Sequence, residues 1–189
     1  MIRDMQNIDD DIIRKKRIIE KTLYSDPDII EMLDNSELDP SVPEDYVYEN
    51  IFPFIRIPGT QDVSKNFITF SVGNMGSTPS NEVMKNQYVQ FVIFVHKDLA
   101  KTKFGMARHD CLGYIIKDLF NLSNRLGLQM KFVSESEGVT DTDYISRTLR
   151  FELITDNYTK PFRTNPYERK SIVDKQDRIL KPEKIGGEN

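Results

Sequence analysis

The sequence predicts an α+β fold, in which a mostly antiparallel sheet of about five strands is flanked by an N-terminal helix pair and one central amphipathic helix. Three observations within residues 87–154 carry this prediction. An alternating apolar run comes first, a run with helical spacing follows it, and two further alternating runs come after the helix. Periods of two and of about 3.6 residues are those of strands and helices, respectively.

The central strand is expected over residues 87–96. One face collects its large apolar side chains, because successive side chains of a strand point to opposite sides; these are Val89, Phe91, Ile93 and Val95. The opposite face, with Val92 and Phe94, is more apolar than a surface open to water usually is. We therefore expect a second element to cover it.

The central helix is expected at about 107–126 and is the candidate for that covering element. Its apolar residues recur at spacings of three and four, as an amphipathic helix requires; they are Leu112, Ile115, Ile116, Leu119, Leu122 and Leu126. Gly127 is expected to end the helix, since glycine adopts the left-handed conformation without strain. Arg125 in the last turn suits the helix dipole.

Two strands follow at about 128–132 and 145–153, and each is expected to have one solvent-exposed face. The acidic segment Glu135–Asp143 between them contains Gly138 and is expected to be a protruding hairpin loop, longer than most.

Residues 1–35 predict a helical hairpin, with one helix over 8–24 and a short second helix that starts at Pro27 after a capping side chain. The basic run Arg14–Arg17 has two interpretations, a phosphate contact or a solvated helix face offset by the acids at 9–11. We favour the second, because four residues fall short of the basic stripe of a nucleic-acid binder.

Between the helix pair and the central strand, two further strands are expected at about 46–57 and 67–72. Pro53 and Pro58 cannot donate ladder hydrogen bonds, so the first of these strands is expected at an edge of the sheet or with a bulge. Residues 73–81 predict a flexible connection, since they lack the spacing of a phosphate-binding loop.

We expect a single α+β domain over 1–155, with the sheet and central helix in 46–155, followed by an extended C-terminal arm over 156–189. The arm holds three prolines, many charges and few apolar residues, and cannot bury enough surface to fold alone. It is either disordered or laid across a neighbouring subunit, where Phe162, Tyr167 and Ile172 would be the anchors.

Composition excludes several classes of protein. The formal charge of −4 gives no broad attraction to DNA or anionic membranes, and no run approaches the ~20 apolar residues of a membrane span. The single cysteine, Cys111, excludes an intrachain disulfide framework.

The sequence shows no convergent set of catalytic or metal-binding groups. His96, His109 and Cys111 are too few for a structural zinc site, and His109 and Cys111, two apart on a helix, do not face each other. The acids Glu135, Glu137, Asp141 and Asp143 could bind a hard cation if the loop folded around it, but such acids are more often solvated. Neither an enzyme nor a cofactor is expected; a small hydrolase or nuclease using these acids is the alternative.

The order of these elements resembles that of tail terminator, or tail completion, proteins of long-tailed bacteriophages. The resemblance covers residues 8–155 and includes the segments IFPFIRIP at 51–58, FITF at 67–70, QFVIFVHK at 90–97 and IIKDLF at 115–120. It implies a structural virion protein of the neck, six copies of which form a ring that caps the tail tube and joins it to the head connector.

The implied partners are further copies of the chain, the tail tube protein and the head connector or head-closure protein. The protein would be made in the host cytoplasm and reside in the virion, with DNA able to pass through the ring but no sequence-specific DNA binding and no membrane contact. Head-to-tail rings need two different complementary surfaces on one subunit. We expect these near the edge strand at Pro53 and at the acidic hairpin. The full set of expected interface residues is Pro53, Glu135, Glu137, Asp141, Asp143, Phe162, Tyr167 and Ile172.

Besides the hydrolase or nuclease, two alternatives stay open. A head-closure or connector-adaptor protein of the same neck would have a similar sequence pattern. A non-viral regulatory binding module that acts as a monomer or dimer is the alternative from another class.

Overall fold

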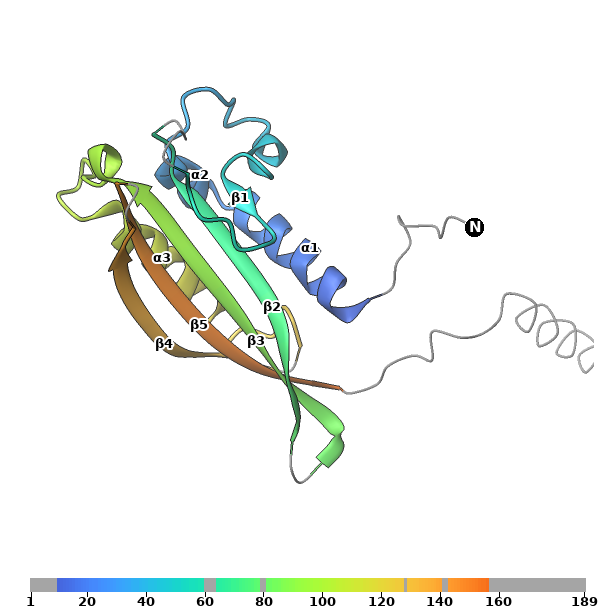
Figure 1. Ribbon diagram of the computed structural model, residues 1–189. Coiled ribbons are helices and arrows are strands. Elements are labelled where there is room, and N and C mark those ends of the chain that lie inside the picture. The colour runs from blue at the N-terminus through green and yellow to red at the C-terminus, as the bar shows by residue number, and fades with distance from the viewer. Residues whose placement is uncertain (1–9, 60–63, 79–80, 128, 141–142, 157–189) are drawn as a thin grey trace, which may run out of the picture. The chain divides into compact units, whose positions relative to one another are not determined.

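The computed structural model describes residues 10–59, 64–78, 81–127, 129–140 and 143–156 (Figure 1). Five strands form one sheet in the order β1-β2-β3-β5-β4, with β1 parallel to β2 and the other pairs antiparallel. The predicted α+β fold is confirmed. The helices are α1 (Asp11–Tyr24), α2 (Pro27–Leu33) and α3 (Arg108–Phe120), and the strands are β1 (Ile51–Phe52), β2 (Phe67–Thr78), β3 (Asn81–His96), β4 (Met130–Val139) and β5 (Tyr144–Asp156). The predicted C-terminal arm lies outside the described residues.

The main core lies between one face of the sheet and the three α-helices, which all pack on that face (Figure 1). The predicted inward face of β3 is confirmed, since its four apolar side chains are fully buried. Phe91 is at the centre of this core: its ring centroid lies 5.9 Å from that of Phe70, 5.1 Å from that of Phe120 and 5.7 Å from that of Phe151. Strands β2 and β5 and helix α3 therefore meet at one side chain.

The opposite face of the sheet is not covered by α3, so that expectation was wrong. The apolar side chains that suggested a cover form a small separate cluster at one end of this face: Phe52, Phe67, Val92, Phe94 and Tyr144. The segment after β1 lies beside this cluster, with the Arg56 guanidinium 4.6 Å from the Phe52 ring centroid and 5.3 Å from that of Phe67.

Side-chain caps begin the first two helices. Asp10 accepts a hydrogen bond from the backbone N–H of Ile13, and Asp26 accepts one from that of Ile29, with Pro27 in the first turn of α2 as predicted. Of the basic run at 14–17, Lys15 is buried: its Nζ donates to Asp11 (2.7 Å) and Gln87 (2.5 Å). Lys15 thus fixes α1 to β3 rather than binding an external phosphate.

Helix α3 ends at Phe120, six residues before the predicted end. Asn121 turns to extended backbone, and its side chain accepts a hydrogen bond from the N–H of Phe132 (3.0 Å). Leu122 adopts a positive φ of 58° and donates its N–H to the carbonyl of Met130 (2.7 Å). Leu126 is buried in the main core although it lies in the loop after α3. Its spacing from the apolar residues of α3 is helical, so the sequence predicted a longer helix.

Two predicted loops are strands. Residues 73–78 continue β2 and pair with β3 as far as Thr78 and Asn81, with irregular register on either side of Gly76, where φ is +104°. The acidic segment Glu135–Asp143 begins within β4, which pairs with β5 as far as Val139 and Ile145. The strand expected over 46–57 is reduced to Ile51–Phe52, which lies at a sheet edge as predicted. Prolines on both sides of the next segment prevent it from continuing the ladder.

Candidate functional site

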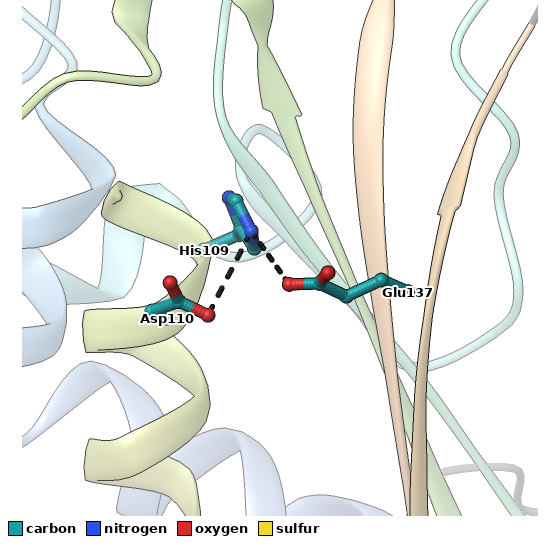
Figure 2. Close-up of side chains that lie close together, drawn as sticks. All are labelled: His109, Asp110 and Glu137. Carbon is teal, nitrogen blue, oxygen red and sulfur yellow. Dashed lines mark hydrogen bonds and ion pairs between the residues drawn. The ribbon is translucent and has the colours of Figure 1, made fainter. Parts of the chain in front are cut away.

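A cluster of charged side chains joins α3 to the two strands at one edge of the sheet, β4 and β5. We call it the Arg147 cluster; its members are His109, Asp110, Lys117, Glu135, Glu137 and Arg147. It contains two of the expected interface residues, Glu135 and Glu137, which point from β4 toward the helix face of the sheet. Figure 2 shows how His109, Asp110 and Glu137 converge from α3 and β4.

Arg147 is the centre of the cluster and comes from β5. It pairs in register with Ile93 and Glu137 on the helix-covered face. Its guanidinium contacts the carboxylates of Asp110, Glu135 (3.0 Å) and Glu137 (3.5 Å). Gly113 of α3 makes room for it, because a Cβ there would lie 2.9 Å from Arg147 Cδ.

His109 lies in the first turn of α3 and is buried. Its Nε2 is 3.0 Å from Glu137 Oε1 and 3.7 Å from Asp110 Oδ1 (Figure 2). Its Nδ1 is buried and has no hydrogen-bond partner among the described residues. The sequence places His109 at the helix start but gives no sign of this partnership with β4.

The cations of the cluster favour ionised carboxylates. Hydrogen bonds from Lys117 and Arg147 hold the pKa of the Glu135 carboxyl below its usual value. At the β4–β5 turn, a hydrogen bond from Lys97 likewise lowers the pKa of Asp143, and Asp143 raises that of Lys97. Both acids are therefore ion-paired within the subunit, and both also remain exposed to solvent.

The three residues of Figure 2 could hold a metal ion, since one ligand atom from each lies within 4.8 Å of the others. One imidazole and two carboxylates suit a divalent transition metal. However, Arg147 already contacts the same carboxylate oxygens of Asp110 and Glu137 that an ion would take. An ion would have to displace a guanidinium, so the geometry fits a cross-link between α3 and the sheet better than a metal centre.

The remaining expected interface residues do not gather at one place. Pro53 is half-buried directly after β1, and Asp143 is exposed at the β4–β5 turn with a positive φ of 63°. Asp141, Phe162, Tyr167 and Ile172 lie outside the described residues. Arg147 was not predicted from the sequence. It could have been noticed because it falls between Ile145 and Leu149 in the alternation of β5, at a position that faces the helices.

Large apolar side chains are exposed on the segment around Pro53. We call this the loop patch; it consists of Tyr48, Phe54, Ile55 and Ile57. The Phe54 ring centroid lies 6.4 Å from that of Tyr48 and 5.7 Å from that of buried Phe52. The patch is thus held by ring contacts to the body, while Ile57 stays 70% exposed.

A second apolar surface is hollowed between α2, the turn before α3, and α3 itself. We call it the α2–α3 groove; its volume is about 530 Å³ and its apolar lining is Met32, Phe104, Met106, Cys111, Tyr114 and Ile115. Three carboxylates complete the lining, those of Asp28, Glu31 and Asp110. The groove is not indicated by the sequence pattern, because Tyr114 lies on the polar side of the helix and Phe104 lies in a turn.

A comparison with known families matches the YomW family over residues 26–153. The chain belongs to the YomW family. This is a phage-type family, so the protein is phage-associated. The matched region runs from the cap of α2 to within β5 and contains the Arg147 cluster, the loop patch and the α2–α3 groove. No curated protein matches the chain. Among the described residues, no helix has the length and apolar composition needed to cross a membrane.

Proposed function

We propose that this YomW-family protein is a structural virion protein of the phage neck. Copies of it form a ring, of six subunits, that terminates the tail tube and joins it to the head connector. The observation that carries the proposal is the exposure of two unlike apolar surfaces on one subunit, the loop patch and the α2–α3 groove. Membership in a phage-type family supports the same class of function.

Two unlike surfaces are what a closed ring requires. In a head-to-tail contact, one surface of each subunit meets a different surface of the next, and the contact closes into a ring when the rotation allows it. Aromatic residues and methionine are enriched in protein interfaces. The groove contributes Phe104, Met106 and Tyr114, of which Tyr114 is 69% exposed.

The ends of such a ring would contact the tail tube protein on one side and the head connector or head-closure protein on the other. Charged groups suit these contacts between stacked rings, because they set orientation and register. The exposed Lys97–Asp143 pair at the β4–β5 turn is a candidate for one of them. In this proposal the protein resides in the virion, and DNA passes through the ring without sequence-specific contacts.

The mass of the protein in the presence of tails tests the ring. Native mass spectrometry of the full chain alone should yield an assembly of about 132 kDa, six times the 22.0 kDa of the chain, or, after incubation with tails from a phage lacking it, a loss of free protein to the tails. A protein that stays monomeric or dimeric in both conditions, and does not bind the tails, would contradict the proposal and favour a regulatory binding module.

A head-closure or connector-adaptor protein is the nearest alternative within the neck. It would also form a ring and use the same two surfaces, so mass alone does not separate it from a tail terminator. The length of tails made without the protein does separate them.

A further inference from the structure

We propose that the loop patch of one copy docks into the α2–α3 groove of the next copy, so that this pair of surfaces is the subunit interface. The inference rests on the proposed ring and deepens it by naming the two surfaces that meet. Both lie within the described residues, and they share no residue. One copy can therefore present the patch while its own groove stays open. The occupant that we propose for the groove is a second copy of the chain, and within that copy the segment 54–57.

The chemistry of the two surfaces is complementary. Among the residues that the structure describes, the groove lining holds six apolar side chains, three carboxylates and no lysine or arginine. The segment 54–57 carries three large apolar residues and one charge, the cation Arg56. Apolar contact would supply the affinity, and the absence of carboxylates from 54–57 would let the segment approach the acidic lining without repulsion.

The carboxylates of the groove differ in how far they are already neutralised. Glu31 pairs with Lys103 (2.6 Å), and Asp110 contacts Arg147. Asp28 has no ion pair within the described part of the chain. The groove thus keeps negative charge that the subunit does not compensate, which would repel an acidic segment and favour one without carboxylates, such as 54–57.

The segment is also preorganised for docking. Prolines at 53 and 58 fix two backbone φ angles, and Pro58 is buried. The Arg56 guanidinium stacks on Phe52 and Phe67, and Phe54 packs against Phe52. A segment that is already ordered loses less conformational entropy on binding than a flexible one.

Cys111 provides a direct test, because it lies in the groove and is the only cysteine of the chain. In the full chain, Ile57→Cys should form disulfides with Cys111 of a neighbouring copy under mild oxidation, with and without tails from a phage lacking the protein. The expected result is a ladder of dimers and higher multimers on a non-reducing gel. Adding Cys111→Ser should abolish the multimers larger than dimers.

Ile154→Cys is the matched control, since Ile154 is 46% exposed and lies near the C-terminal end of β5, where its neighbour Leu153 faces the core. A random collision would cross-link Ile154→Cys to Cys111 as readily as Ile57→Cys. An equal ladder from both variants, or none from Ile57→Cys, would overturn the proposal. A ladder from Phe162→Cys with none from Ile57→Cys would place the C-terminal arm in the groove and would equally overturn it.

Complementation tests the direction of the contact. Ile57→Asp should block the patch by adding a negative charge opposite an acidic lining, and Tyr114→Glu should block the groove. Each variant alone should fail to assemble, whereas a mixture should form a dimer that cannot extend, because one intact patch meets one intact groove. If the mixture of the two variants forms no dimers while the wild type still forms rings, this interface is refuted, but the proposed ring is not. Absence of wild-type rings with tails would refute the proposed function itself.

Discussion

Arg147→Met tests whether the guanidinium holds α3 to the edge of the sheet. Its three carboxylate partners Asp110, Glu135 and Glu137 have side chains that are 48%, 37% and 59% exposed. Pairs this exposed contribute about 0.5–1 kcal/mol each, so we expect a loss of about 2 kcal/mol in the free energy of unfolding. For a domain of this size, that corresponds to a fall in Tm of roughly 4–8 °C.

Urea unfolding at low and high salt is the assay, and Arg150→Met is the matched control. Arg150 lies on the same strand but faces the other side of the sheet, with its guanidinium 5.1 Å from the Tyr88 ring centroid. Losing that exposed contact should cost about 0.5–1 kcal/mol. The excess loss in Arg147→Met should shrink in 1 M salt, because salt screens half-exposed charges. Equal losses in both variants, or an excess that does not depend on salt, would refute the role given to Arg147.

The same variant tests whether Arg147 keeps cations out of the cluster. Removing the guanidinium leaves His109, Asp110 and Glu137 with ligand atoms within 4.8 Å of one another. Micromolar Zn²⁺ should therefore raise the Tm of Arg147→Met but not that of the wild type or of Arg150→Met. An equal rise in all three proteins would show that the guanidinium does not control access.

Three further predictions concern the core, the pH dependence and the arm. Phe91→Ala should lower the free energy of unfolding by about 3–5 kcal/mol in urea titrations, because it leaves a cavity between three rings; a loss below about 1 kcal/mol would contradict the described core. Burial alone would raise the pKa of Asp11, but hydrogen bonds from Lys15, Gln87 and Arg14 outweigh it and hold the pKa well below its usual value. Asp11 therefore stabilises the fold at neutral pH and loses this effect as pH falls below about 4, so the stability gap between wild type and Asp11→Asn should narrow in acid; a constant gap would count against it. Deleting 156–189 should weaken ring formation in native mass spectra if the arm crosses to a neighbour, and unchanged mass would exclude that role.

The sequence predicted the elements whose apolar residues repeat with one period over many residues. Strand β3 is the best case, since its alternating apolar residues face the core as expected. The N-terminal helices were also predictable, because Asp26 and Pro27 mark a helix start chemically. These signals are local in the sequence, so they can be recognised without knowing which segments pack against them.

The errors arose where long-range contacts decided the outcome. Leu126 has helical spacing, yet it reaches the core from a loop because Asn121 and Leu122 bond to the start of β4. From the sequence, Glu135 and Glu137 were expected in a solvated loop. In the structure they lie on β4 and contact Arg147 of the neighbouring strand β5. The α2–α3 groove is formed by segments far apart in the chain, so no single stretch of sequence indicates it.

The length of tails assembled without this protein is the most direct test of the role that we propose for it at the end of the tail. Electron micrographs of tails from a phage that lacks the YomW-family protein should show overlong tubes, and adding the purified protein during assembly should restore a uniform length. Tails of normal length that fail to join heads would contradict tail termination and assign the protein to head closure or connector adaptation.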